Sequence, residues 1–212
     1  MAEGMRPYYQ DESVTIYNAD CREVLPTLAK VDLVLTDPPY GIGANNMTLG
    51  NGYKRIDRGE NDWDSEPADV SWILKYGSPA VIWGGNYFNV PPARCWFVWD
   101  KGTGDNDFAD CELAWTNRDG VVKQFSRSWV GNNAKEPAEF SRLHPTQKPV
   151  ALMRWCLEFF PDAQTILDPF MGSGTTLRAA KDLGRKAIGI EIEERYCEIA
   201  ANRMSQLAME LN

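Results

Sequence analysis

Asp168–Thr176 reads Asp-Pro-Phe-Met-Gly-Ser-Gly-Thr-Thr and is the most informative stretch of this 212-residue chain. A short β-branched run, Thr165–Leu167, precedes it, and a helical pattern, Thr175–Leu183, follows. A glycine turn between a strand and a helix lets a ligand approach the backbone closely. The stretch is not a P-loop, because no Gly-Lys-Ser/Thr follows, and Leu177 stands where a G-x-G-x-x-G motif needs its third glycine.

The strand expected after this turn strengthens the interpretation as a ligand site. Lys186–Ile190 is apolar and β-branched, and it ends in Glu191. An acidic side chain roughly 20 residues beyond such a turn, at the end of the neighbouring strand, suits hydrogen bonding to ribose hydroxyls. The pattern therefore predicts a nucleoside-containing ligand, although a simple tight turn remains an alternative for the glycines alone.

Short apolar runs alternate with helical patterns along the rest of the chain, which predicts an α/β fold with a mostly parallel sheet and helices on its faces. The length suits a single domain, 1–212. One pair of strands, on either side of the acidic stretch Lys101–Asp110, is expected to be antiparallel, and Gly184 is expected to end a helix. The expected strands are Val14–Ala19, Val31–Thr36, Ala80–Trp83, Trp96–Trp99, Leu113–Thr116, Thr165–Leu167 and Lys186–Ile190; the expected helices are Arg22–Ala29, Val70–Tyr76, Val150–Phe159, Thr175–Leu183 and Glu193–Leu211.

A second motif, Asp37-Pro38-Pro39-Tyr40, follows the strand Val31–Thr36. The two prolines fix the backbone, and the motif holds a carboxylate, a rigid carbonyl and an aromatic ring together. Those groups can grip a planar amine, because two acceptors meet its two N–H bonds and the ring offers a face for stacking. The alternative for this motif is a turn with a capping aspartate.

Acidic residues recur where the expected strands end. Asp20 follows the first strand and could simply cap the next helix. However, Asp37, Asp168 and Glu191 also lie at carboxyl ends of expected strands. Ligands bind at that edge of an open α/β sheet, so the four acids together predict a binding site there.

The charge pattern separates two regions within an acidic protein of net charge −8. Asp100–Asp119 carries two basic and six acidic residues, a net charge of −4, whereas Lys123–Arg154 has six basic and two acidic residues, a net charge of +4. The basic region suits phosphate contacts, although a solvated surface explains it equally well. A long glycine-rich loop, 41–62, is expected to be mobile, and its Lys54, Arg55 and Arg58 are candidates for contacts with nucleic acid.

Composition excludes several classes of protein. No apolar run reaches the roughly 18 residues of a membrane-spanning helix. The five cysteines are scattered, without a C-x-x-C pair, so neither a disulfide framework nor a zinc site is expected, and a cytoplasmic location fits best. No metal is expected, and the single histidine, His144, is interpreted as structural or adjacent to a cofactor.

These motifs resemble the amino-methyltransferase family of DNA modification enzymes, in its permuted beta group. There the Asp-Pro-Pro-Tyr motif precedes the Asp-Pro-Phe-x-Gly-Ser-Gly-Thr-Thr loop, and the block His144–Pro149 is similar to the segment that leads into the cofactor half. The resemblance extends from about Val14 to Arg203. It implies a Rossmann-like, seven-stranded methyltransferase sheet with circularly permuted motif order.

The resemblance also implies roles for individual residues. Asp37, Pro38, Pro39 and Tyr40 would be catalytic, with Asp37 and the Pro38 carbonyl accepting from the target amine and Tyr40 stacking on the flipped base. Glu191 would hold the ribose of S-adenosyl-L-methionine. The full set of residues expected to bind this cofactor is Asp20, Cys21, Asp37, Thr146, Lys148, Asp168, Phe170, Gly172, Ser173, Gly174, Thr175, Glu191 and Ile192.

The implied function is methylation of the exocyclic N6 amine of adenine in DNA, expected to be double-stranded, with methylation of the N4 amine of cytosine as the alternative. The stretch 101–143 is short for a target-recognition region. We therefore expect the methylated DNA sequence to be short or loosely specified, or its recognition to depend on an oligomer such as a homodimer. An oxidoreductase that uses the Gly172–Gly174 turn is a competing hypothesis, but it offers no role for Asp-Pro-Pro-Tyr. A non-catalytic binding subunit is another, against which the intact motifs argue.

Overall fold

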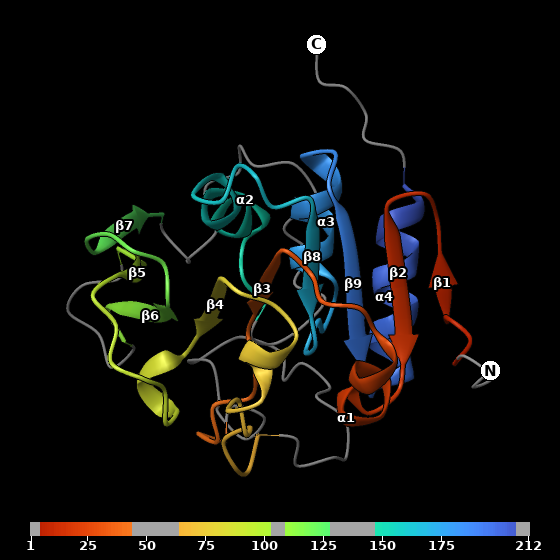
Figure 1. Ribbon diagram of the computed structural model, residues 1–212, viewed down its shortest axis with the longest axis horizontal. Helices are drawn as coiled ribbons and strands as arrows, with labels where there is room; N and C mark the ends of the chain where they lie inside the picture. Colours follow the sequence, from red (N-terminus) through yellow and green to blue (C-terminus); the bar gives the residue numbers. More distant parts are fainter. Residues whose placement is uncertain (1–4, 44–63, 103–108, 128–146, 207–212) are drawn as a thin grey trace, which may run out of the picture.

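The computed structural model describes residues 5–43, 64–102, 109–127 and 147–206, which form an α/β fold around one sheet (Figure 1). The strand order is β1-β2-β9-β8-β3-β4-β6-β5-β7. The strands are β1 (Tyr9–Gln10), β2 (Val14–Asn18), β3 (Leu33–Thr36), β4 (Ala80–Trp83), β5 (Trp96–Asp100), β6 (Cys111–Thr116), β7 (Lys123–Ser126), β8 (Thr165–Asp168) and β9 (Lys186–Glu191). The α-helices are α1 (Cys21–Val24), α2 (Val150–Glu158), α3 (Thr175–Asp182) and α4 (Glu194–Ser205), and the 3-10 helices are η1 (Leu25–Thr27), η3 (Ile73–Lys75) and η4 (Gly85–Tyr87).

All seven predicted strands are present, and β1 and β7 extend the sheet at its two edges. β6 runs antiparallel to both β4 and β5, which confirms the predicted antiparallel pair, and β1 is antiparallel to β2. The pairs β2–β9, β9–β8, β8–β3 and β3–β4 are parallel. The edge strands escaped prediction because β1 has two residues and β7, Lys-Gln-Phe-Ser, has little apolar character.

The helix predictions hold for the long segments and hold less well for the two short ones. The predicted helix Arg22–Ala29 is α-helical only in α1 and continues as the 3-10 helix η1. α2, α3 and α4 match their predicted positions, and Gly184 follows α3 with a φ of +69°, as a helix-ending glycine should. The predicted helix 70–76 was wrong, since only a 3-10 turn, η3, forms there. The end of the segment pairs with the chain before β3 instead, since the Tyr76 carbonyl accepts from the Val31 N–H at 2.9 Å and Gly77 forms a parallel bridge with Val31.

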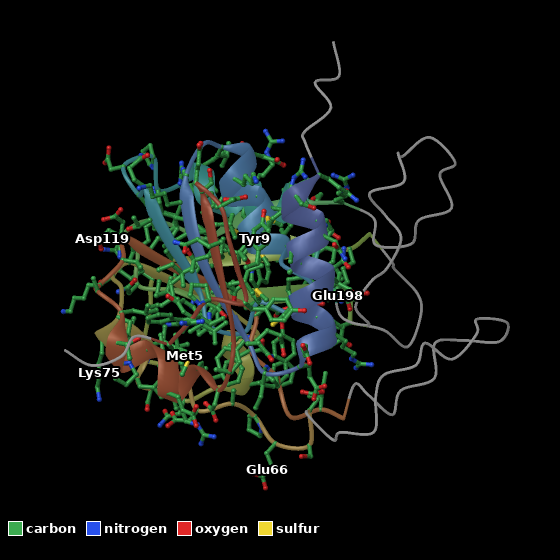
Figure 2. The ribbon with its side chains drawn as sticks, turned by 90° about the vertical axis from the view of Figure 1, so that its right-hand side faces the viewer. Met5, Tyr9, Glu66, Lys75, Asp119 and Glu198 are labelled. Atoms are coloured by element: carbon green, nitrogen blue, oxygen red, sulfur yellow. The ribbon has the colours of Figure 1, made fainter. Side chains whose placement is uncertain are left out.

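Two apolar clusters lie on opposite faces of the sheet. One contains Ile16, Leu35 and Trp83 together with residues of α2, α3 and α4. The other contains Val34 and Ile82 together with residues of α1, η1 and η3. Figure 2 shows this separation, with α4 on one side of the strands, its Glu198 directed away from them, and α1 on the other side. The sheet is thus covered on both faces, as parallel strands require. No helix in the described part of the chain has the length and apolar character to cross a membrane.

The direction of the chain through the sheet reverses between β3 and β8. From β3 the chain continues to β4 on one side, whereas from β8 it continues to β9 on the other. Such a reversal leaves a crevice at the carboxyl ends of the two strands, which is where ligands bind in open α/β sheets.

Lys181 on α3 links the segment before β2 to the end of α4, which the permuted order predicts to be neighbours. The Lys181 ammonium donates to the Asp11 carboxylate at 2.6 Å and to the Met204 carbonyl at 2.8 Å. The end of α4 therefore lies near the start of β2, where it would be in a non-permuted chain in which α4 leads directly into β2.

The close packing of α3 on β9 leads to a prediction about Gly189. A Cβ on Gly189 would lie 2.5 Å from Met171 Sδ and 2.7 Å from Leu177 Cδ2. Gly189→Ala should lower the free energy of unfolding by about 1–3 kcal/mol, because overpacking forces neighbours off their preferred rotamers. Urea denaturation measures it, with Lys186→Ala, exposed on the same strand, as the control expected to change stability by less than about 0.5 kcal/mol. Equal stability of both variants would contradict the packing.

Candidate active site

Four acidic residues line one edge of the sheet, at the carboxyl ends of adjacent parallel strands. In spatial order these are Asp20 after β2, Glu191 at the end of β9, Asp168 at the end of β8 and Asp37 after β3. The arrowheads of β2 and β9 point to this edge in Figure 1. The predicted convergence of the four residues is therefore present, and Asp168 and Asp37 flank the point where the strand order reverses.

Asp168 is buried and tied to β3. The Thr36 hydroxyl donates to Asp168 Oδ1 at 2.7 Å, and the Phe170 backbone N–H donates to the same oxygen at 3.2 Å. Burial raises the pKa of Asp168 to about 6, against the lowering effect of its hydrogen bonds with Thr176 and Thr36. Thr36 joins the two halves of the site. The sequence did not predict this role, because a threonine at the end of a strand gives no indication of a partner 132 positions away.

The glycine turn is held against the end of β9 by Glu191. Gly172 and Gly174 both have positive φ, +49° and +79°, which explains the two glycines. The Gly172 backbone N–H donates to Glu191 Oε2 at 3.0 Å, and the Glu193 N–H donates to Oε1 at 2.9 Å. Burial raises the pKa of Glu191 to about 7. Each carboxylate oxygen has a second lone pair, so Glu191 can still accept hydrogen bonds from a ligand.

Other residues support the turn from outside. The Ser173 hydroxyl donates to Gln147 Oε1 at 3.2 Å. Arg203 on α4, which the sequence did not suggest, donates to the Ser173 carbonyl at 3.2 Å and to Thr175 Oγ1 at 3.4 Å. The Phe170 ring lies 6.1 Å from that of Trp72, on the face that carries α1.

Directly after β2, the hydrogen bonds of Asp20 are mainly those of a helix N-cap. Asp20 caps α1 by accepting from the Arg22 backbone N–H at 2.8 Å, and it forms an ion pair with the Arg22 side chain, which lowers the pKa of Asp20. Burial raises the pKa of the Cys21 thiol to about 11. Ile192, directly after Glu191, is 64% exposed, so its side chain is accessible beside the edge.

The first and last residues of the Asp37–Tyr40 motif are hydrogen-bonded to each other. The Tyr40 hydroxyl donates to Asp37 Oδ1 at 2.6 Å. The Pro39 carbonyl accepts from the Ala68 N–H at 3.0 Å, whereas no residue of the described ranges donates to the Pro38 carbonyl. Asp37 and the Pro38 carbonyl are the two acceptors that the sequence assigned to a planar amine.

Aromatic side chains surround Tyr40. Its ring stacks on that of Tyr87, with centroids 5.1 Å apart and planes 15° apart, and meets Phe88 edge-on at 6.1 Å. Gly84, with a φ of +70°, comes so close that a Cβ there would lie 2.1 Å from Tyr40 Cε1. The ring is therefore held in place by both the η4 turn and the end of β4.

Lys148 lies with the catalytic candidates. Its ammonium contacts Asp37 Oδ1 at 2.5 Å, the Tyr40 hydroxyl at 2.9 Å and Glu112 Oε2 at 3.0 Å. The other oxygen of Glu112 pairs with Lys101 at 2.6 Å. The two lysines hold the pKa of Glu112 down at about 2 in spite of its burial. Sequence reasoning missed Glu112, which stands among other acidic residues where its partner Lys148 gives no local signal.

Several candidates lie outside the described residues. These are Thr146, Lys54, Arg55, Arg58 and His144, together with most of the loop 41–62 and of the recognition region 101–143. Within the described ranges, no group of three or more His, Cys, Asp or Glu side chains could hold a metal ion.

Comparison with known proteins assigns the chain to a family. The family model described as DNA methylase, for N6 and N4 methyltransferases, matches residues 95–202, which is half of the chain. The chain belongs to this DNA methylase family. The glycine turn of the methylase, Lys148 and Glu112 all fall inside the matched region, and Asp37–Tyr40 lies before it.

The chain is also similar to curated relatives over most of their length, and it shares its fold with solved structures. The type II methyltransferase M2.LlaDCHI of Lactococcus lactis subsp. cremoris is 28% identical over 95% of the methylase and 93% of the relative. M2.DpnII of Streptococcus pneumoniae is 25% identical over 94% and 92%. Two solved structures share the fold: the M1.HpyAVI–SAM complex (TM-score 0.56, 24% identity, 91% of this chain and 100% of that one) and the cytosine-N4-specific PvuII DNA methyltransferase (TM-score 0.60, 18% identity, 98% and 92%).

The contact between Gly84 and Tyr40 predicts that Gly84→Ala impairs the methylase. The new methyl group must push the Tyr40 ring aside, so the rate of methyl transfer to DNA should fall at least about tenfold, as small misplacements at reacting centres do. Gly102→Ala is the matched control, because Gly102 also has a positive φ of +59° but nothing lies within 4 Å of a Cβ there. Transfer at the wild-type rate by Gly84→Ala would show that the position of Tyr40 does not matter.

Proposed function

We propose that this methylase transfers a methyl group from S-adenosyl-L-methionine to the exocyclic N6 amine of adenine in double-stranded DNA, after the base has been flipped out of the duplex. The observation that carries the proposal is the pairing at the reversal point of the sheet. Asp37, the candidate acceptor for the amine, and Asp168, which opens the glycine turn, follow adjacent strands that the Thr36 hydroxyl joins at 2.7 Å. Methyl donor and acceptor would thus meet between β8 and β3.

On the cofactor side, the residues fit S-adenosyl-L-methionine. Glu191 would accept hydrogen bonds from the ribose hydroxyls, and its position at the end of β9 suits that role. Asp168, Phe170 and the turn Gly172–Thr175 would lie along the methionine end, with Thr146 near its carboxylate. Asp20, Cys21 and Ile192 would border the adenine ring. Asp20 would do so in addition to its capping role, which leaves the outer part of its side chain accessible.

Lys148 is assigned differently from the other cofactor candidates. Its ammonium already meets two carboxylates and a phenol oxygen. We therefore place it with Asp37, on the side of the target amine, instead of beside the methionine carboxylate.

On the target side, the chain supplies acceptors and a stacking surface. An exocyclic amine is a poor nucleophile, because its lone pair is delocalised into the ring of the base. Acceptance of its two N–H bonds by Asp37 and the Pro38 carbonyl would favour a pyramidal nitrogen and localise that pair. Pro39 fixes the backbone between the acceptors and Tyr40. Stacking on Tyr40 would recover part of the few kcal/mol that base flipping costs.

The bound cofactor supplies an electrophilic methyl group on a sulfonium, so the protein mainly positions the reactants. The same geometry serves the N4 amine of cytosine, which presents the same two N–H bonds. We prefer adenine because the motif begins with Asp, an association implied by the family resemblance, and methylation at N4 of cytosine is the alternative.

DNA is the substrate of the family. Which residues of this chain contact the DNA stays a prediction. Lys54, Arg55 and Arg58 would contact phosphates from the loop that follows Tyr40, and the basic stretch Lys123–Arg154 is the alternative surface. A homodimer would compensate for a short recognition region. A cytoplasmic location also stays a prediction.

The function is tested by identifying the modified base. DNA is incubated with the methylase and the cofactor, then digested to nucleosides and analysed by mass spectrometry. Wild-type protein should produce N6-methyladenine, and Asp37→Ala should lower its yield at least about 100-fold, since the main acceptor for the amine is lost. Affinity for the cofactor should fall much less.

The control is Asp162→Ala, an exposed aspartate between α2 and β8, far from the carboxyl ends of the strands, which should leave transfer unchanged. N4-methylcytosine as the product would favour the alternative. Transfer by Asp37→Ala within a few fold of wild type would contradict the role of Asp37.

A second prediction concerns the pH dependence of cofactor binding. Ribose hydroxyls donate best to an ionised carboxylate, and Glu191 ionises with a pKa of about 7 in the free protein. Affinity for S-adenosyl-L-homocysteine, measured by calorimetry, should therefore rise about three- to fourfold from pH 6.5 to pH 8. Asp168, with a pKa of about 6, is already largely ionised in that window.

The matched variant is Glu191→Gln, which keeps an acceptor oxygen for the Gly172 N–H but does not titrate. It should bind more weakly at pH 8, and its affinity should be flat across the window. A wild-type affinity that does not change with pH, or an unchanged slope in Glu191→Gln, would argue that Glu191 does not meet the ribose.

A further inference from the structure

Among the described residues, contacts to the Asp37 carboxylate are made to one of its oxygens, Oδ1. Lys148 Nζ reaches Oδ1 at 2.5 Å and the Tyr40 hydroxyl reaches the same oxygen at 2.6 Å. In the described portion of the chain no group donates to Oδ2. The side chain of Asp37 also keeps 20% of its surface accessible, whereas that of Lys148 keeps 3%. One oxygen is thus fixed from the protein side, and the other retains its acceptor capacity.

The ammonium of Lys148 has as many acceptors as it has N–H bonds. An ammonium donates three hydrogen bonds and accepts none. Its three partners within the described ranges are Asp37 Oδ1, the Tyr40 hydroxyl at 2.9 Å and Glu112 Oε2 at 3.0 Å. The charge also lies 5.2 Å from the centre of the Tyr40 ring and 5.6 Å from that of Trp83. Lys148 is therefore held in one place, and a group held in one place can orient its neighbour.

Glu112 completes this arrangement from β6. Its Oε2 contacts Lys148 and lies 3.3 Å from the Tyr40 hydroxyl, while Oε1 pairs with Lys101 at 2.6 Å. The result is an alternating row, Lys101–Glu112–Lys148–Asp37, with no net charge. Alternation matters because an unpaired buried charge is strongly destabilising, so each member holds the next.

We propose that Lys148 and Glu112 are positioning residues for methyl transfer. Lys148 occupies Oδ1 of Asp37 so that Oδ2 is presented to the target amine, and Glu112 holds Lys148 in place. This inference rests on the proposed function in assigning the amine to Asp37. Neither residue need touch the substrate or the cofactor.

The two residues act on Asp37 with opposite electrostatic signs. Burial raises the pKa of Asp37, the positive charge of Lys148 opposes that rise, and the negative charge of Glu112 adds to it. Tyr40 faces the same carboxylate as a neutral donor, because burial and the two carboxylates raise its pKa well above the ordinary value. Asp168 lies near enough to interact with Asp37 electrostatically, and Lys101 acts through Glu112.

Because Lys148 and Glu112 shift the pKa of Asp37 in opposite directions, their variants can be distinguished from variants that only disturb the structure. In protein labelled with carboxyl-¹³C aspartate, the Asp37 resonance is assigned by its loss in Asp37→Asn and titrated by NMR. Lys148→Met should raise the pKa of Asp37, and Glu112→Gln should lower it. The acid limb of the pH–rate profile should move in the same directions. Both variants should lower kcat at least about tenfold while the affinity for S-adenosyl-L-homocysteine changes less than about twofold.

Each outcome decides the inference. If Lys148→Met does not fold, as judged by circular dichroism, Glu112→Gln carries the test together with Lys148→Arg, which keeps the charge and should keep the pKa of Asp37 near that of wild type. An unchanged Asp37 titration in Glu112→Gln would overturn the proposal. If the wild-type protein methylates no base, the proposed function fails, but the NMR titration still reports whether Lys148 and Glu112 set the state of Asp37. If transfer occurs and the titrations do not move, the positioning role alone fails.

Discussion

The buried hydrogen bond from the Thr36 hydroxyl to Asp168, 2.7 Å long, joins the two strands between which the sheet reverses direction. On one side of it the chain builds the glycine turn and Glu191, and on the other it builds Asp37, Tyr40 and their partners. Because parallel strands present their carboxyl ends at one edge, residues from both ends of the sequence converge there. The bond fixes the two halves of the site relative to each other, and every role proposed for a side chain depends on that spacing.

The two halves treat their buried carboxylates differently. Asp168 and Glu191 have hydrogen-bond donors but no salt bridge among the described residues, and burial raises the pKa of both. Asp37 pairs with Lys148, and Glu112 pairs with both Lys148 and Lys101, in a row of alternating charge. A carboxylate that awaits the hydroxyls of a ligand can tolerate a raised pKa until that ligand binds. A carboxylate that must orient an amine benefits from a fixed counter-ion, which is what Lys148 provides.

The sequence predicted the parts of the fold that depend on local pattern. The seven long strands, the three long helices and the two motifs at strand ends all have a periodicity or a turn chemistry of their own. The segment 70–76 was mispredicted as an α-helix, because its apolar pattern does not reveal that Tyr76 and Gly77 pair with Val31. Asp20 shows the limit at the site, since the same residue caps α1 and lies at the acidic edge.

Glu112 and Lys148 show a different limit. Glu112 is not distinguished by its neighbours in sequence, and the motif that contains Lys148 does not reveal its partners. The contact between the two residues joins β6 to the segment before α2. Lys148 was predicted to be functional but was assigned to the cofactor, because its motif precedes the cofactor half of the chain. Only the packed structure places its ammonium on Asp37. Long-range ion pairs of this kind carry no periodic signal, so a single sequence does not reveal them.

The most direct test of how the two halves work together is a crystal structure of the protein with S-adenosyl-L-methionine bound. The ribose hydroxyls should lie on Glu191, the methionine end should follow Asp168 and the Gly172–Gly174 turn, and the sulfonium methyl should point across the reversal between β8 and β3 toward Asp37. A cofactor bound elsewhere, or with its methyl group directed away from Asp37, would contradict the assignment of methyl donor and acceptor to the two sides of the Thr36–Asp168 bond.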